Sequence, residues 1–553
     1  SGGHGHVFVG VNVPFGMVQL GPTSIPQEWD WCSGYHNSDS TVIGFSHTHL
    51  SGTGIGDLFD ITVMPVVGEV TYGRGREEDP STGMWSYADR SREVARPGYY
   101  SVPLTRYGIT AEMTATNRVG LHRYTFPQSE EAGIVINLMN GGCWDRPMDA
   151  QIERVDPMTG QPDPNGQALR GYRYSRGWAD DQKVYFYAEF SKPFKDFKVI
   201  RGNIQIWQDE FKDIAAFAHA YFEAEPQEQI MMKVALSPVS VEGAYANMKA
   251  ELSGWDFEAT AKAAKRVWNE ELGKIKTEGK DKEALKIFYT ALYHAMIAPS
   301  TFCDVDGSYR GADGQTYENP GYQTYTTFSL WDTYRAAMPL YSIFQSERYT
   351  DMINTMLSIY KEQGKLPVWH LHGCETNCMV GNPGIIPVAD AIVKDLPGID
   401  YELAFEAMKA SALRPDRGQE HRMKYGYIPC DLMNESVAYD LEYALADGAL
   451  ANAAKVLGKE DDYQHFLNRS KSYVDLFDHE LGFIRGKDSR GRFRTEYSPF
   501  ASTHRADDYC EGNGWQYTWL VPHDFKGLVS CFGTKNAFLD KLDSLFVVSS
   551  VIE

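Results

Sequence analysis

The sequence predicts a multidomain β-plus-α protein with an N-terminal antiparallel β-sandwich, a helical linker and a C-terminal helical domain. Two observations carry this prediction. Over residues 1–240, short alternating or apolar runs recur between clusters of Gly, Pro and Asn, which is the pattern of many short strands. From Val241 onward the chain is rich in Ala, Glu and Lys, and apolar residues recur at helical spacing. We therefore expect a sandwich over 1–240, a linker over 241–280 and the helical domain over 281–553.

The strand predictions rest on runs of β-branched and aromatic residues. Clear examples are Ile61–Val67, Gly133–Leu138, Lys183–Ala188 and Ile230–Leu236. The segment 157–166 is rich in Pro, Gly and Asn and is expected to be a surface loop.

The helix predictions begin with two capped helices. Asp256 is placed to cap a helix that runs through Trp268, and a second helix follows Asp281. The apolar stripe of the second helix consists of Leu285, Phe288, Tyr289, Leu292, Tyr293 and Met296. Later helical stretches are Ser329–Gln345, Tyr349–Glu362, Pro387–Lys394, Tyr401–Leu413, Ser436–Leu457, Asp461–Leu476 and Gly514–Val521. Loops with no strands are expected between them, which favours a ring or array of helical hairpins.

Composition narrows the class of ligand. Lys and Arg number 53 against 74 Asp and Glu, so the formal charge is −21. Nucleic acids and anionic lipid surfaces both need a basic footprint, so neither is expected as a partner. No run of ~18 apolar residues occurs, so no membrane span is expected. The charge fits a soluble protein with a neutral substrate.

The cysteines and histidines offer only weak metal signals. The eight cysteines are scattered, and Cys374-x-x-x-Cys378 lacks the second pair that a structural zinc site needs. The even number of cysteines permits disulfides but does not imply them. His47-x-His49 and His370-x-His372 would each share one face of a strand, so a metal site is conceivable, but local hydrogen bonding is the more common role.

The glycine-rich segment 52–56 is not expected to bind phosphate. It leads into the strand-like run Ile61–Val67, whereas a phosphate loop opens a helix.

The segment Tyr509–Trp519 carries the strongest chemical signal. It combines the carboxylate of Glu511 with glycines, amides and aromatic residues, which together suit a sugar ring and a leaving oxygen. Trp515 and Trp519 are four residues apart, so in a helix they would share a face. The structural alternative is that Glu511 is a carboxylate at a helix start and that the tryptophans belong to the core.

Similar islands of aromatic and acidic residues lie elsewhere in the chain. They surround Trp31, the pair Trp331 and Asp332, and the pair His372 and Glu375. Each alone is compatible with a core or capping role. Their recurrence alongside the Glu511 segment favours a carbohydrate pocket gathered from loops.

A set of motifs in fixed order runs through nearly the whole chain. They are Gly3–His6, Val13–Leu20, Ser33–Tyr35, Gly44–Gly52, Ser329–Asp332, Glu375–Met379, Glu435–Val437, Glu511–Tyr517 and Val521–Asp524. Together they resemble glycoside hydrolase family 92, the calcium-dependent exo-acting α-mannosidases.

The resemblance implies a β-sandwich packed on an (α/α)6 barrel and inverting hydrolysis of a terminal α-mannoside. It assigns Glu511 as the general acid and Asp332 to the −1 subsite. It also implies Ca²⁺ as cofactor, in contact with the 2- and 3-hydroxyls of the sugar. Further substrate contacts are expected from Trp331, Trp31, Glu375, His372 and Trp515. The segment His370–Cys374, which includes His372, departs from the expected pattern and is placed on the leaving-group side, which leaves the linkage open.

Two motifs implied by the resemblance do not occur before Glu553. The catalytic base belongs to a Gly-Asn-x-Asp type motif, and most calcium ligands belong to a Gly-Asn-Glu-Pro type segment. The barrel is therefore expected to be incomplete at its C-terminus, with the base and the metal ligands beyond Glu553. A truncated, inactive relative is the alternative.

The predicted function is an exo-acting α-mannosidase that acts on a mannose-containing oligosaccharide or a glycoprotein glycan, such as an N-glycan or a mannan. The alternatives are another (α/α)6-barrel glycosidase or phosphorylase, a non-catalytic mannose-binding relative, and a structural scaffold. By resemblance, the protein is expected outside the cytoplasm, in the bacterial periplasm or secreted.

Overall fold

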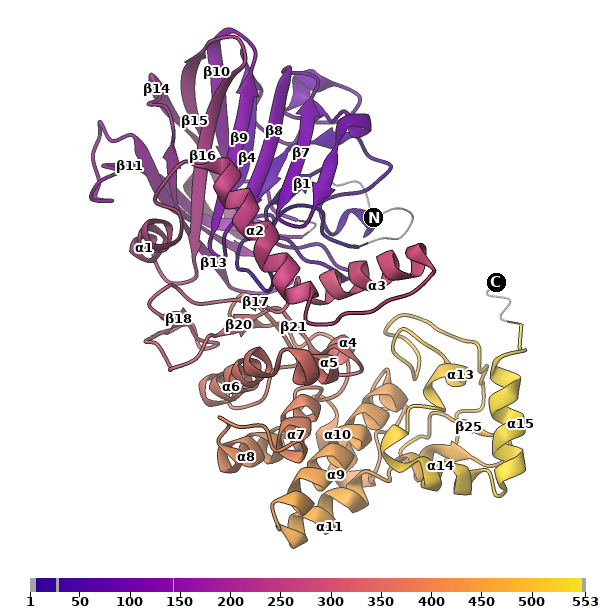
Figure 1. Cartoon of the computed structure of the whole chain (residues 1–553). Helices are drawn as coiled ribbons and strands as arrows, with labels where there is room; N and C mark the ends of the chain where they lie inside the picture. Colours follow the sequence, from indigo (N-terminus) through magenta and orange to yellow (C-terminus); the bar gives the residue numbers. More distant parts are fainter. Residues whose placement is uncertain (1–5, 26–28, 143, 550–553) are drawn as a thin grey trace. The chain divides into compact units, whose positions relative to one another are not determined.

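The computed structural model describes residues 6–25, 29–142 and 144–549. The motif residues 3–5, Cys143 and the terminal segment 550–553 lie outside these ranges. The chain divides into two compact units (Figure 1). The first consists of residues 1–327 with 371–376, and the second of residues 328–370 with 377–553. Residues 281–327, which the sequence analysis placed in the helical domain, thus share contacts with the sandwich.

The first unit contains the predicted antiparallel sandwich. One sheet has the strand order β1-β3-β4-β10-β15-β14 and the other β11-β12-β13-β16-β9-β8-β7-β6. The strands of the chain are β1 (Gly21–Thr23), β2 (Thr41–Val42), β3 (Gly44–Ser46), β4 (Thr62–Val67), β5 (Ser86–Tyr87), β6 (Val94–Arg96), β7 (Tyr99–Leu104), β8 (Ile109–Ala115), β9 (Val119–Phe126), β10 (Ser129–Asn137), β11 (Arg146–Val155), β12 (Ala168–Arg176), β13 (Gln182–Phe190), β14 (Asp196–Trp207), β15 (Glu210–Ala224), β16 (Glu228–Ser237), β17 (Ser300–Thr301), β18 (Tyr309–Arg310), β19 (Thr316–Tyr317), β20 (Tyr325–Thr326), β21 (Phe328–Ser329), β22 (Trp369–Leu371), β23 (Cys374–Glu375), β24 (Phe477–Asp478) and β25 (Phe483–Ile484).

Alternation along the strands builds the sandwich core. On β12, Leu169 and Arg173 are buried while Tyr172 and Tyr174 are half-buried on the opposite face. The buried guanidinium of Arg173 is paired with two buried carboxylates, Asp60 at 2.7 Å and Asp145. The core between the sheets is otherwise a continuous apolar cluster, as the strand pattern predicted.

Two helices cover the outer face of the larger sheet. The helix α1 (Val241–Glu251) is capped by Ser240, and α2 (Phe257–Leu272) is capped by the predicted Asp256. Met248 and Phe257 pack there against strand residues such as Tyr187. The helix α3 (Lys282–Ala295) follows its predicted cap Asp281, but Leu292 is its single buried residue, so most of the predicted stripe is exposed or half-exposed.

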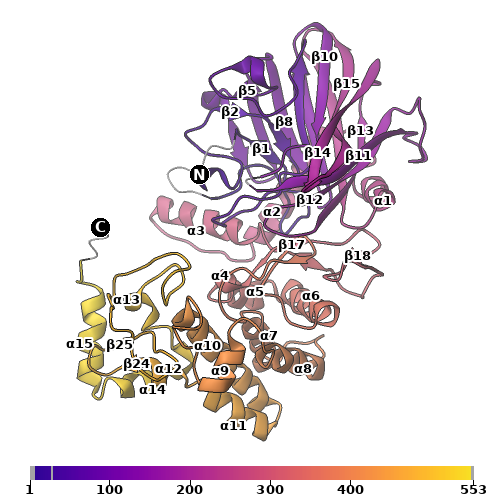
Figure 2. The ribbon, with the colours of Figure 1, turned by 180° about the vertical axis from the view of Figure 1, so that it is seen from behind.

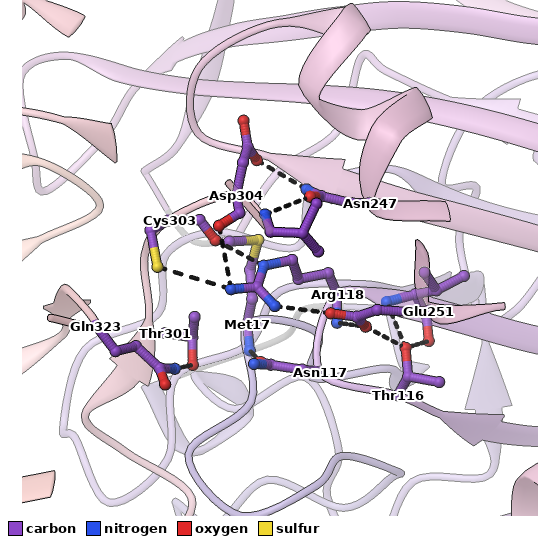
Figure 3. A network of polar contacts seen from close by, with 12 residues as sticks. Met17, Thr116, Asn117, Arg118, Asn247, Glu251, Thr301, Cys303, Asp304 and Gln323 are labelled. Carbon is purple, nitrogen blue, oxygen red and sulfur yellow. Dashed lines mark hydrogen bonds and ion pairs between the residues drawn. The ribbon is translucent and has the colours of Figure 1, made fainter. Parts of the chain in front are cut away.

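A polar network ties the end of α1 and the following segment to the sandwich (Figure 3). Arg118 donates to the carboxylate of Glu251 at 2.7 Å and to the carbonyl of Cys303 at 2.7 Å. The side-chain amide of Asn247 donates to Asp304 at 2.7 Å. Burial raises the pKa of Asp304 to about 6. The linker is thus joined to the first unit by buried charge as well as by apolar contact.

The second unit is largely helical. Its centre is α10 (Ser436–Val456), which is buried over most of its 21 residues and packs against α7, α8 and α11 (Figure 2). The remaining helices of the chain are α4 (Leu330–Thr333), α5 (Ala337–Phe344), α6 (Ser346–Gln363), α7 (Ile385–Val393), α8 (Tyr401–Ala412), α9 (Gln419–Tyr425), α10 (Ser436–Val456), α11 (Glu460–Arg469), α12 (Tyr473–Leu476), α13 (Gly514–Tyr517), α14 (Phe525–Cys531) and α15 (Lys535–Leu545), with short 3-10 helices at Trp29–Trp31, Pro80–Thr82, Arg90–Arg92 and Pro522–Asp524.

Three helix predictions were too long. The stretch Ser329–Gln345 is broken into α4 and α5, the stretch Asp461–Leu476 into α11 and α12, and the stretch from Gly514 ends as a helix at Tyr517. At the second break, Ser472 turns its hydroxyl to buried Asp440, so a tertiary contact replaces helix continuity. The expectation of no strands among the helices was wrong, because the short strands β17–β25 lie there. The (α/α)6 closure stays a prediction.

Candidate active site

Glu511 lies on a tight loop two residues before Asn513, the N-cap of α13. Asn513 and Gln516 form a capping box: the side chain of each accepts from the backbone N–H of the other, at 3.3 and 3.0 Å. The backbone of Glu511 has φ 46°, in the left-handed region that side chains rarely occupy. A Cβ at Gly514 would lie 2.2 Å from the Tyr497 hydroxyl, which explains a glycine there. Glu511 is therefore presented by a strained loop that its surroundings hold in place.

The N-terminus of α10 anchors this loop. The backbone N–H groups of Val437 and Ala438 donate to the carbonyl oxygen of Asp508 at 3.0 and 3.1 Å. The N–H of Glu435 donates to the carbonyl of Asp507 at 2.6 Å. Glu435 provides no side-chain cap, so the loop backbone takes over that role for α10. The same bonds that complete the helix fix the chain three residues before Glu511.

The segment that carries Asp332 is also held by α10. Ser329 Oγ donates to Asp332 Oδ2 at 2.6 Å within the short helix α4. On either side of Asp332, the side chains of Trp331 and Arg335 donate to Glu442 Oε1 at 3.0 and 2.6 Å. The hydroxyl of Tyr334 donates to Glu442 Oε2 at 2.8 Å. One helix therefore supports both predicted active-site carboxylates.

Electrostatics suit Glu511 to proton donation. Partial burial is the largest cause that raises its pKa above the usual glutamate value, and the negative charges of Asp332 and Glu435 add to the rise. His504 and Arg505 act in the opposite direction. A carboxyl group with a raised pKa stays protonated closer to neutral pH, which a general acid requires.

Three of the predicted substrate-binding residues belong to the first unit. The ring of Trp31 stacks on His36 with centroids 4.3 Å apart, and its Nε1–H donates to Asp39 at 2.7 Å. The carbonyl of His372 accepts from Arg310 at 2.6 Å, and burial lowers the pKa of its imidazole to about 4. Glu375 is half-buried in β23.

The other predicted residues belong to the second unit, where Trp515 and Trp519 lie apart. The ring of Trp515 meets Phe483 edge-on, with centroids 4.9 Å apart, and Lys541 Nζ lies 4.7 Å from it. Trp519 stacks on Phe532 at 6.0 Å. The shared helical face considered for the two tryptophans is not formed, because α13 ends at Tyr517. The negative charge of Asp332 thus acts on the pKa of Glu511, and Trp331 is the chain neighbour of Asp332, while Trp515 packs in an aromatic cluster.

The sequence analysis missed two carboxylates. Glu435 acts electrostatically on Glu511, and Glu442 holds the segment around Asp332. Glu435 was quoted as part of a motif without a role. Glu442 lies among apolar residues in the stretch Ser436–Leu457, and a charge in an apolar helical run is a signal that could have identified it.

Both histidines of the pair at 47 and 49 have local hydrogen-bond partners, and His49 Nδ1 donates to the carbonyl of Gln19 at 2.8 Å. His47 Nδ1 must donate to the carbonyl of Ile61 at 2.6 Å, so its Nε2 accepts from His122 Nε2–H at 3.0 Å. His122 Nδ1 then accepts from the Tyr124 hydroxyl at 2.7 Å. These contacts define a buried chain of neutral groups.

Within residues 6–25, 29–142 and 144–549, no group of three or more His, Cys, Asp or Glu side chains is arranged to hold a metal ion. The described cysteines are free thiols. In the same ranges, no helix is long and apolar enough to span a membrane.

An antiparallel sandwich followed by a helical unit, with an acid of raised pKa on a glycine-rich loop, is an arrangement that suits a multidomain glycoside hydrolase. Family models sharpen this class: the glycosyl hydrolase family 92 N-terminal domain matches residues 1–237, and the catalytic domain of that family matches residues 243–552. The chain belongs to glycosyl hydrolase family 92.

Solved structures and a curated relative agree. The chain is 38% identical to the family GH92 α-mannosidase BT3965 from Bacteroides thetaiotaomicron, solved with mannoimidazole, with a TM-score of 0.93 over 100% of this chain and 73% of that one. The inverting mannosidase BT2199 of the same organism is 27% identical, with a TM-score of 0.85 over 98% and 71%. An uncharacterized secreted glycosidase of Arthroderma benhamiae is 27% identical over 98% of this chain and 72% of its own length.

Proposed function

We propose that this protein is an exo-acting α-mannosidase that hydrolyses terminal α-mannosyl linkages of N-glycans or mannans with inversion. The observation that carries the proposal is the pairing of Glu511 with Asp332. An acid with a raised pKa sits on an immobilised loop, and a second carboxylate lies close enough to act on it. Family membership and the similarity to two mannosidases support the choice of sugar.

Each candidate residue has a proposed role. Glu511 donates its proton to the glycosidic oxygen as the bond to the leaving group breaks. Asp332 binds hydroxyls of the terminal sugar, and Trp331 lies beside it. An inverting enzyme also needs a second carboxylate to activate water, roughly 6.5–9.5 Å from the acid. No residue of this chain is assigned that role.

The residues of the first unit and Trp515 are proposed to complete substrate contacts. Trp31 offers an aromatic ring, Glu375 a carboxylate, and His372 a neutral imidazole on the leaving-group side. Trp515 would contact the substrate from the aromatic cluster that it forms with Phe483.

Calcium is part of the proposal on the strength of the family resemblance. Ca²⁺ would supply charge and orientation at the sugar hydroxyls, using oxygen ligands. Because the described residues form no metal-binding group, no ligand is named. The (α/α)6 barrel, the boundaries 1–240, 241–280 and 281–553, and a secreted or periplasmic bacterial location are proposed on the same basis.

The test uses the full-length polypeptide, including any sequence that continues beyond Glu553. Mannose release is measured from a panel of α-linked mannobioses with the native protein, after chelation, and with Ca²⁺ restored. The variant Glu511→Gln is run on the same panel and on an aryl mannoside whose phenol leaves without protonation. We expect release that is lost with chelator and recovers with Ca²⁺, and an E511Q variant impaired about 100- to 10,000-fold on mannobioses but much less on the aryl substrate.

Other results would identify the alternatives. Mannose binding without release from any substrate indicates a non-catalytic binding protein. Turnover that requires inorganic phosphate indicates a phosphorylase.

A further inference from the structure

Glu442 is a buried carboxylate without a role in the proposed chemistry. Its side chain is 2% exposed, and it projects from the second turn of α10. A carboxylate is costly to bury unless donors compensate it. Here the donors are the Trp331 indole N–H, the Tyr334 hydroxyl and the Arg335 guanidinium, at 3.0, 2.8 and 2.6 Å. They flank Asp332 on both sides.

The helix that carries Asp332 needs such support. α4 has only four residues, and its N-cap Ser329 makes no capping hydrogen bond to the backbone. A single helical turn is not stable on its own, because its nucleation cost exceeds the gain from its few hydrogen bonds. Buried Leu330 and the pairing of β21 with β22 hold its start, and the contacts with Glu442 hold the side chains on both sides of Asp332.

Glu442 has little freedom to move. Gly381 has φ 82°, in the left-handed region that favours glycine, and a Cβ at this position would lie 2.5 Å from Glu442 Cβ. The backbone of Gly381 thus packs directly on the base of the side chain. Six residues earlier on the same helix, Ser436 begins the turn whose N–H groups hold Asp508 and the Glu511 loop.

We infer that Glu442 is a positioning residue of the active site, which places Asp332 relative to Glu511 by holding Trp331, Tyr334 and Arg335. The inference rests on the proposed function. It assigns to α10 a second task besides core packing: its first turn fixes the segment of the acid, and its second turn fixes the segment of the subsite carboxylate.

Two substitutions separate position from charge. Glu442→Ala removes all three contacts. Glu442→Gln keeps them, because the amide oxygen accepts from Trp331 and Arg335 while the amide N–H group donates to the Tyr334 oxygen. The matched control is Asp447→Ala, which removes another buried carboxylate of the same helix. Asp447 pairs with Arg422 at 2.5 Å and with Arg469 at 3.1 Å, rather than with the residues that flank Asp332.

The expected result is a specific loss of catalysis. Because a displacement of about 1 Å costs on the order of 100-fold in rate, E442A should lower kcat about 100-fold per folded molecule, and E442Q should stay within about tenfold of the native protein. D447A should lose thermal stability but keep kcat and KM in its folded fraction. Equal kcat for E442A and native protein, or an equal loss in D447A, would overturn the inference.

A second readout needs no turnover. The indole N–H resonance of Trp331 in tryptophan-labelled protein is assigned with Trp331→Phe and followed in the Glu442 variants. It should move toward the position of a solvent-bonded indole in E442A, move less in E442Q, which keeps an acceptor, and hold its place in D447A; an unmoved resonance in E442A contradicts the inference. If the native protein releases mannose from no substrate while the resonance still shifts, the proposed function fails and the contact stands.

Discussion

The backbone N–H of Val437 donates to the carbonyl oxygen of Asp508 at 3.0 Å. This bond joins the first turn of the central helix to the loop that presents Glu511. The side chain of Asp508 is itself buried and accepts from Arg494 at 2.7 and 3.0 Å. The acid is therefore held from two directions, by the end of a helix and by a charge-assisted pair.

Asp508→Ala should loosen this anchor. Removal of a buried carboxylate that accepts a bidentate pair should lower the free energy of unfolding by about 1–3 kcal/mol, and kcat should fall with it. Urea denaturation measures the first effect and steady-state kinetics the second. The control is Glu496→Ala, at an exposed position in the same region, which should change little. Similar losses in both variants would contradict the anchoring role.

The pH dependence of hydrolysis should respond to single charges around Glu511. Asp332 raises the pKa of Glu511, so Asp332→Asn should lower that pKa and move the alkaline limb of kcat/KM to lower pH. Arg505 lowers the same pKa, so Arg505→Gln should move the limb to higher pH. The measurement is a pH–rate profile for each variant. Shifts in the same direction would show that the limb belongs to another group.

Gly381→Ala should destabilise the second unit. The new Cβ would lie 2.5 Å from Glu442 Cβ, and the backbone is in the left-handed region. Both effects together should cost on the order of 2–4 kcal/mol. Gly426→Ala is a matched control, because it has the same φ of 82° with no heavy atom within 4 Å of the added Cβ. It should lose only about 1 kcal/mol, and chemical denaturation distinguishes the two.

The buried histidine chain should make the first unit sensitive to acid. Burial lowers the pKa of His47 to about 4 and that of His122 well below its usual value. Below pH 6.5 the unfolded chain binds protons that the native chain does not, so the free energy of unfolding falls until the native pKa is reached. For His47 alone the loss between pH 6.5 and 4 should be about 3 kcal/mol.

His122→Gln tests this explanation. The glutamine can accept from Tyr124 and donate to His47, but it does not titrate. Unfolding measured from pH 7 to 4 should therefore show a weaker loss of stability than in the native protein. His465→Gln, at an exposed position, should leave the pH dependence unchanged. An unchanged profile in H122Q would show that these buried histidines do not cause the acid sensitivity.

Much of the fold was predictable because its signals are local. The caps Asp256 and Asp281 lie where the helices begin, and the runs at 61–67 and 183–188 form strands. The breaks in the helical stretches were not predictable. Tyr334 and Arg335 have acceptable helix propensity, and only their hydrogen bonds to Glu442 show why the chain leaves the helix there.

By itself, the sequence determined the strand-to-helix change near Val241, the helix caps and the ordered motifs that include Glu511 and Asp332. These depend on residue type and spacing along the chain. Only the tertiary structure decided that Glu442 supports the Asp332 segment, that Trp515 and Trp519 lie apart, and that the acid has a raised pKa. Burial and charge proximity arise from segments distant in sequence, as for Trp331 and Glu442, which are 111 residues apart, and their strength depends on distances that no local pattern encodes.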